Sequence, residues 1–208
     1  MPRRSETPDY YFEDEKVILD PKTPSEYALH AVFIRFATTT ESKIDAFLRQ
    51  SLDQDPLLPR YMGPGVDTKF DDILGSLGKI GQKHTKPVVD SIMRWRRDQL
   101  ENVGSDVIHH HMSRSPTAPT RAVRNTDVPG LLNERKSLAS IYIMCRALIA
   151  ILKEVPKDAL TEAMGHSLEK TTFDQFRKPD LKLLVQSENH RINAELYSTL
   201  LGHLANIR

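Results

Sequence analysis

Three consecutive histidines, His109-His110-His111, are the side chains of this 208-residue sequence that most suggest metal chemistry. Imidazole is a common ligand of transition metals. Adjacent histidines rarely converge on one ion without carboxylates or thiolates nearby, and the acid closest to them in the sequence is Asp106. We therefore interpret the triplet as part of a solvated polar segment, and we predict no metal site and no cofactor.

The single cysteine, Cys145, lies in the longest apolar run, residues 138–152. A reactive thiol needs partial exposure and a positively charged neighbour. Arg146 follows directly, but successive helical residues point about 100° apart. We therefore predict a buried structural cysteine. One cysteine excludes an internal disulfide framework and fits a reducing, cytoplasmic location, and the run is shorter than the roughly 20 residues of a membrane span.

Other catalytic signatures are missing from the sequence. Gly63-Pro64-Gly65 lacks the Lys-Ser/Thr that completes a phosphate-binding loop. There is no Gly-x-Ser-x-Gly, no His-Glu-x-x-His and no pair of carboxylates with evident partners. The sequence therefore predicts no catalytic residues, and we expect a protein that is not an enzyme.

Basic side chains are concentrated between positions 83 and 124, where eight basic and four acidic residues give a local net charge of +4. A polyanion such as nucleic acid or anionic lipid is one partner for such a tract. The arginines available for it are Arg94, Arg96, Arg97, Arg114, Arg121 and Arg124. The chain as a whole is nearly neutral, with 29 Lys+Arg against 28 Asp+Glu. We therefore favour a solvated helix face followed by a basic loop, and nucleic acid is the less favoured partner.

Helical periodicity dominates the segments that must position these residues. Thr23-Pro24-Ser25-Glu26 is a capping box with proline at the first helical position. Apolar residues then recur at helical spacing, and no segment shows convincing strand alternation. The predicted helices span residues 24–52 with an interruption at 38–40, 68–82, 87–101, 131–154, 159–166, 168–176 and 192–207. A short apolar run at 181–185 is predicted as helix or coil. The helix at 131–154 is apolar nearly all round, which predicts a central, buried position.

Proline and glycine mark the segments between the helices. We predict a flexible N-terminal arm over residues 1–23, a loop over 53–66 and a disordered loop over 104–130. The remaining chain, 24–208, is predicted as one helical-repeat domain. We expect antiparallel helical hairpins within 24–52, between 68–82 and 87–101, and between 131–154 and 192–208. The fold class is therefore all-α, and the expected architecture is a HEAT- or armadillo-like α-solenoid segment. The last helix has no C-cap, which suggests a piece of a longer protein.

Gly75, Gly78 and Gly81 lie three residues apart on one predicted helix. Glycine lowers helix propensity, so the spacing has two readings of equal weight. Either a neighbouring helix approaches closely at these positions, or the helix is simply weak.

Scattered core and contact residues resemble a known family. The matching stretches are Glu26 to Phe36, Lys43-Ile44, Phe70 to Leu77, Trp95-Arg96-Arg97, Glu134 to Ala139, Tyr142 to Cys145, Asn193 to Tyr197, and Leu201-Gly202. Together they resemble the start of the Furry family of cell-morphogenesis proteins, whose fungal members are called Tao, Pag or Mor proteins. The resemblance covers about residues 24 to 208, and it transfers no individual binding residue.

The resemblance implies a non-enzymatic scaffold. Family members are very large helical-repeat proteins that associate with NDR-family kinases and Mob co-activators. They support polarised growth, actin organisation and the separation of daughter cells, which implies a position in the cytoplasm at the cell cortex or at sites of polarised growth. The chain is much shorter than the family, so whether it binds the kinase alone stays open. The alternatives are a basic-tract binder of nucleic acid or anionic lipid and, with least support, an enzyme.

Overall fold

The computed structural model describes residues 21–111, 128–157, 159–177 and 181–207, and every regular element within them is an α-helix. The helices are α1 (Pro24–Leu48), α2 (Leu58–Met62), α3 (Thr68–Gly81), α4 (Thr85–His111), α5 (Val128–Glu154), α6 (Glu162–Arg177), α7 (Leu181–Gln186) and α8 (Glu188–Ile207). The predicted all-α class is confirmed.

The predicted capping box starts α1. The Glu26 N–H donates to Thr23 Oγ1 at 3.3 Å, and the Thr23 N–H donates to Glu26 Oε2 at 3.0 Å. Backbone hydrogen bonds from Lys22 and Thr23 lower the pKa of Glu26. The predicted interruption at residues 38–40 is wrong. Thr40 is buried and its hydroxyl donates to the Ala37 carbonyl at 2.8 Å, so this polar side chain is satisfied within the helix and α1 continues.

Asp67 caps α3 and also ties that helix to α1. Its carboxylate accepts from the backbone N–H groups of Lys69 at 3.0 Å and Phe70 at 3.2 Å. The Lys43 ammonium of α1 lies 2.7 Å from the same carboxylate. The hydrogen bond from Lys43 lowers the pKa of Asp67 despite partial burial. One acid therefore satisfies the start of α3 and fixes its position against α1.

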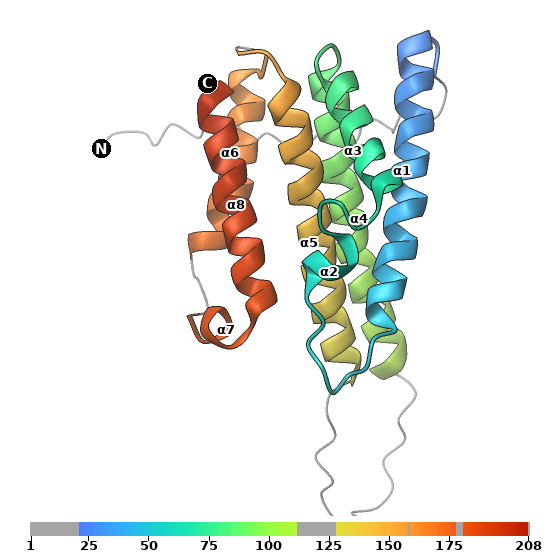
Figure 1. Cartoon of the computed structure of the whole chain (residues 1–208), viewed down its shortest axis with the longest axis vertical. Coiled ribbons are helices and arrows are strands. Elements are labelled where there is room, and N and C mark those ends of the chain that lie inside the picture. Colours follow the sequence, from blue (N-terminus) through green and yellow to red (C-terminus); the bar gives the residue numbers. More distant parts are fainter. Residues whose placement is uncertain (1–20, 112–127, 158, 178–180, 208) are drawn as a thin grey trace, which may run out of the picture.

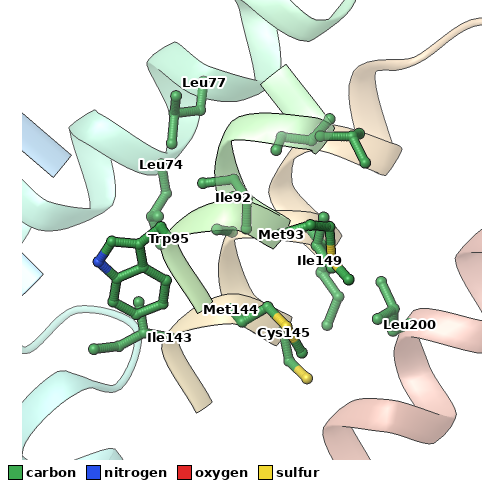
Figure 2. Close-up of a cluster of buried hydrophobic side chains, with 14 of the residues drawn as sticks. Leu74, Leu77, Ile92, Met93, Trp95, Ile143, Met144, Cys145, Ile149 and Leu200 are labelled. Carbon is green, nitrogen blue, oxygen red and sulfur yellow. The ribbon is translucent and has the colours of Figure 1, made fainter. Parts of the chain in front are cut away.

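The centre of the core is α5. It packs against α1, α3, α4 and α8 (Figure 1), and most of its side chains from Leu138 to Leu152 are buried. Figure 2 shows the middle of this core, where Leu74, Ile92, Ile149 and Leu200 come from α3, α4, α5 and α8. The predicted central helix is confirmed.

Successive long helices run antiparallel (Figure 1), with α1, α4 and α6 in one direction and α3, α5 and α8 in the other. Two helices that are not consecutive, α3 and α5, therefore run parallel and end at the same end of the bundle. The predicted antiparallel pair 68–82 with 87–101 is found as α3 and α4. The prediction is wrong for 131–154 with 192–208, because α5 and α8 pack together but run parallel (Figure 1), and for 24–52, which contains the single helix α1. A HEAT- or armadillo-like repeat stays a prediction.

The glycines of α3 explain how closely it packs on α5. A β-carbon at Gly78 would lie 2.7 Å from the Ala150 carbonyl oxygen, and one at Gly81 would lie 3.0 Å from Ile151 Cγ2. A β-carbon at Gly75 would meet no atom within 4 Å. The close-approach interpretation therefore holds for two of the three positions.

The predicted loop over 104–130 is too long at both ends. The backbone of α4 is helical through His111, because Gly104 alone costs a helix only about 1 kcal/mol and no proline occurs between Pro87 and Pro116. Pro129 is the second residue of α5, where a missing N–H breaks no helical hydrogen bond. The middle of the predicted loop, 112–127, and most of the predicted arm, 1–20, lie outside the described residues.

Two smaller boundaries also differ from the prediction. The separate helices predicted at 159–166 and 168–176 form the single helix α6, and the predicted 53–66 loop contains α2. In α6 the Thr172 hydroxyl donates to the Leu168 carbonyl at 2.7 Å, so a polar residue is again satisfied inside the helix. The apolar run at 181–185 is helical, as α7.

Candidate interaction surface

The arginines predicted for polyanion contact do not form one exposed row. Arg97 is exposed and Arg94 is half-buried. Arg96 is turned toward α5, where its guanidinium donates to Ser137 Oγ at 3.3 Å, and burial lowers its pKa. The other three predicted positions, 114, 121 and 124, lie outside the described residues. A polyanion contact through these arginines therefore stays a prediction.

The histidine triplet ends α4, and its side chains are outside what the structure describes. Within the described residues, no group of three or more His, Cys, Asp or Glu side chains is arranged to hold a metal ion. None of the helices in that same part of the chain is long and apolar enough to cross a membrane.

Cys145 is enclosed by the core. Its side chain is 0% exposed, and burial raises the pKa of its thiol to about 12. The nearby Arg96 guanidinium favours the thiolate but does not outweigh the burial. The predicted burial of this cysteine is confirmed, and its environment keeps the thiol protonated at neutral pH.

The segment between α1 and α3, residues 49–66, is fixed to α5 by an arginine. Arg135 is 3% exposed, and its guanidinium donates to the backbone carbonyls of Gln50 at 3.2 Å, Ser51 at 3.0 Å and Gln54. The Arg135 guanidinium therefore lies beside the residues that follow the C-terminal end of α1. We call residues 49–66 the clamped segment.

Asn189 of α8 holds the next part of the clamped segment with both ends of its amide. The Leu58 N–H donates to Asn189 Oδ1 at 3.0 Å. The Asn189 amide nitrogen donates to Asp55 Oδ1 and to the Pro56 carbonyl, each at 3.0 Å. Because Asn189 is 1% exposed, these hydrogen bonds are shielded from water and link α8 directly to the start of α2.

Arg146 fixes the far end of the clamped segment. Its guanidinium donates to the Met62 carbonyl, and it lies 2.7 Å from Asp71 Oδ1 on α3. Asp71 Oδ2 accepts from the Gly65 N–H at 2.8 Å. Burial raises the pKa of Asp71, but the hydrogen bonds from Arg146 and Gly65 bring it below its usual value. The guanidinium also lies 5.5 Å from the centre of the Phe70 ring.

The sequence-based reasoning missed this set of clamping side chains, Arg135, Arg146 and Asn189. One signal was available, because Arg146 is a charged residue inside an otherwise apolar run. A buried arginine needs hydrogen-bond acceptors. Because the side chains around Arg146 on this helix are apolar, its acceptors must come from other segments of the fold. Periodicity alone does not reveal which carbonyls they are.

One exposed face of α1 is largely apolar. The exposed positions between 27 and 38 include one charged residue, Arg35, and the others are Tyr27, Ala28, Ala31, Ile34 and Thr38. Tyr27 is 58% exposed and Ile34 is 50% exposed. At 1.5 Å per residue this face, which we call the α1 strip, is about 17 Å long. An exposed apolar strip with a polar rim is typical of a protein contact surface.

Comparison with known proteins gives these features a family context. Residues 134–208 match the family described as "Cell morphogenesis N-terminal". The chain is 26% identical to "Cell morphogenesis protein PAG1" of Saccharomyces cerevisiae over 89% of this chain and 11% of that protein. It is 24% identical to "Cell polarity protein mor2" of Schizosaccharomyces pombe over 88% of this chain and 8% of that protein. No solved structure matches the chain.

The chain therefore spans only about a tenth of the length of these two relatives, 11% and 8%. The family match covers most of the central helix α5 and the helices that follow it, and it includes the clamping residues Arg135, Arg146 and Asn189. The resemblance expected from the sequence is thus confirmed, and the chain is similar to the cell-morphogenesis proteins of the Furry family.

Proposed function

We propose that this chain is a non-enzymatic interaction module that acts in cell morphogenesis and polarity by supporting NDR-family kinase signalling. The observation that carries the proposal is homology over 89% and 88% of the chain to proteins named for morphogenesis and polarity. The kinase and its Mob co-activator come from the family resemblance. On this proposal the chain works in the cytoplasm, at the cell cortex or at sites of polarised growth.

The architecture supports such a role. A bundle in which one helix, α5, contacts α1, α2, α3, α4 and α8 is a stable platform for surfaces that meet other proteins. Antiparallel connections between successive helices support a HEAT- or armadillo-like solenoid, an architecture that builds long binding surfaces by stacking hairpins. We propose that the chain is a segment of that kind.

The α1 strip is the surface that we propose for the kinase–Mob partner. Its small residues, Ala28 and Ala31, leave room for close approach, while Tyr27 and Ile34 supply apolar area at either side of them. An exposed helix face of this pattern fits the apolar face of a partner helix, with anchors at i, i+4 and i+7. Aromatic anchors such as Tyr27 are enriched at the energetic centres of interfaces.

Co-purification with an NDR kinase and its Mob protein tests this proposal. The double variant Tyr27→Glu with Ile34→Glu places two charges on the α1 strip and should reduce recovery of the kinase at least tenfold, because each buried anchor contributes about 1–2 kcal/mol or more. Val185→Glu is the matched control, since Val185 is 76% exposed on α7 and far from the strip in the fold.

Recovery of the kinase with Val185→Glu should equal that of the unmodified chain. Absence of the kinase with both this chain and the corresponding full-length protein would refute the kinase part of the proposal. Equal recovery with the double variant would refute the α1 strip as the contact surface.

A further inference from the structure

Four lysines lie at one end of the bundle. Lys79 is in the last turn of α3 and Lys83 follows that helix, while Lys153 is in the last turn of α5 and Lys157 follows it. All four lysines are exposed, and none of them forms an ion pair with another described residue. We call this group the lysine end.

The two pairs of lysines are brought together by contacts between the helix ends. The Gln82 amide donates to Glu154 Oε2 at 2.8 Å. A β-carbon at Gly81 would lie 4.0 Å from Val155 Cγ2. In both contacts, the residue from each segment is at most two sequence positions away from one of the four lysines. Glu154 therefore provides one carboxylate, already hydrogen-bonded, among four ammonium groups.

Helix dipoles explain only part of this charge. The parallel helices α3 and α5 place two C-terminal ends side by side (Figure 1), and a lysine in a last turn offsets the negative end of the dipole. Lys79 and Lys153 have such positions. Lys83 and Lys157 follow the last helical residues, Gly81 and Glu154. The two helix ends together carry only about one negative charge, which even with the Glu154 carboxylate does not balance four ammonium groups.

The N-terminal segment of the same chain has the complementary charge. Residues 1–20 contain six acidic and three basic side chains. Four of the acids, Asp9, Glu13, Asp14 and Glu15, lie in a stretch without a basic residue, together with Tyr10, Tyr11 and Phe12. An acidic stretch that also carries aromatic rings has both the charge for the ammonium groups and apolar area for the lysine stems.

The point where this segment joins the fold is at the lysine end. The start of α1 lies at the same end of the bundle as the ends of α3 and α5 (Figure 1), and α1 packs directly on α3. Pro21, the first described residue, is buried. At about 3.3 Å per residue, Glu15 reaches roughly 20 Å from Pro21 and Asp9 roughly 40 Å. Both distances are long enough for the segment to reach the ends of neighbouring helices, since packed helix axes lie about 8–10 Å apart.

We propose that the lysine end is a docking surface for an acidic peptide segment, and that its occupant is the stretch 9–15 of this chain. The short connection to Pro21 gives the stretch an effective concentration in the millimolar range, so weak charge contacts suffice for docking. Because the ammonium groups are exposed, the contact weakens as salt rises. The proposal is independent of kinase binding, and either can fail alone.

Carbodiimide cross-linking of the full chain tests the proposal, since this reagent joins a carboxylate to a lysine that touches it. We expect cross-links from the acids of 9–15 to all four lysines of the lysine end. Lys69 is the internal control, because it is exposed at the opposite end of α3, about 15 Å along the helix from Lys79. The cross-link yield should fall several-fold between about 50 and about 500 mM NaCl.

Two variant pairs separate docking from chance reaction. Lys83→Arg with Lys157→Arg keeps the charge and removes two reactive amines, so cross-links to Lys79 and Lys153 should persist. Lys83→Glu with Lys157→Glu should reduce those same cross-links at least several-fold.

A mixture of unlabelled and ¹⁵N-labelled chain shows whether the cross-linked peptides come from one molecule. Cross-links within one molecule support the proposal. Cross-links found only between molecules would overturn the assignment of the occupant, and reaction with Lys69 equal to that with the lysine end would overturn the surface itself.

Discussion

Gly78 of α3 rests directly on the backbone of Ala150 in α5, so that a β-carbon on residue 78 would lie 2.7 Å from the Ala150 carbonyl oxygen. Real β-carbons do not approach a backbone oxygen so closely, and the neighbouring atom belongs to the central helix rather than to a movable side chain. The absence of a side chain at this position therefore sets the distance between α3 and α5. It also brings the ends of these helices together.

The first prediction compares two glycines of α3. Gly78→Ala should lower the free energy of unfolding by about 1–3 kcal/mol, because overpacking against the α5 backbone outweighs the gain in helix propensity. Gly75→Ala is the matched control, since no atom lies within 4 Å of its added methyl group. It should raise the free energy of unfolding by up to about 1 kcal/mol. Urea denaturation measures both, and stabilisation by both variants would contradict the close contact.

These glycines also show what sequence reasoning can and cannot determine. The spacing of Gly75, Gly78 and Gly81 indicates one helix face, which is a local property. Which of them touches a neighbour depends on the register of α3 against α5, more than 70 positions away in the sequence, as Gly78 and Ala150 show. The capping box at Thr23 and Glu26 was predictable because all of its atoms lie within four residues.

The clamped segment was not predictable for the same reason. Its hydrogen bonds join positions such as Leu58 and Asn189, separated by 131 residues, and most of its acceptors are backbone carbonyls that have no sequence signature. The extension of α4 past Gly104 was not predictable from periodicity, because the polar residues that follow this glycine do not repeat at helical spacing. The central position of α5, in contrast, follows from its apolar character on all sides, since such a helix has no polar face to expose to solvent.

The second prediction concerns the amide of Asn189. Asn189→Asp keeps the shape but removes both N–H donors, so a carboxylate would face Asp55 Oδ1 and the Pro56 carbonyl at hydrogen-bonding distance. We expect the free energy of unfolding to fall by about 1–3 kcal/mol at neutral pH. Asn133→Asp is the control, because Asn133 is only partly buried on α5 and should change stability by less than about 0.5 kcal/mol. Equal effects of the two variants in thermal unfolding would argue against the clamp.

The third prediction uses the pKa of Asp71. Because the folded state holds this pKa below its usual value of 3.8, the carboxylate stabilises the fold fully above that value. The contribution is lost as the pH falls through the folded-state pKa. Asp71→Asn should therefore lower the free energy of unfolding at neutral pH by about 1–3 kcal/mol, and should reduce its decline in acid.

Urea denaturation at several pH values between about 6 and 2 measures this difference. The curves for the unmodified chain and for Asp71→Asn should approach each other at the acid end, because both side chains are then neutral. A constant gap over the whole range would show that the loss is one of packing rather than of charge. Asp72→Asn, on the exposed face of α3, is the control for stability at neutral pH.

The fourth prediction makes Cys145 a reporter of opening of the core. A thiol with a pKa of about 12 has a thiolate fraction about 1,000-fold below that of one at the ordinary value of 9.0, and this side chain is also 0% exposed. A thiol reagent should therefore modify the native chain only when α5 separates from its neighbours. If Gly78→Ala lowers the free energy of unfolding by about 2 kcal/mol and opening is in rapid equilibrium, that variant should react about 30-fold faster.

Labelling followed by mass spectrometry measures the rates, with Gly75→Ala expected to react no faster than the unmodified chain. Labelling of the native protein as fast as of the urea-denatured chain would contradict the enclosed position of Cys145 between α4, α5 and α8.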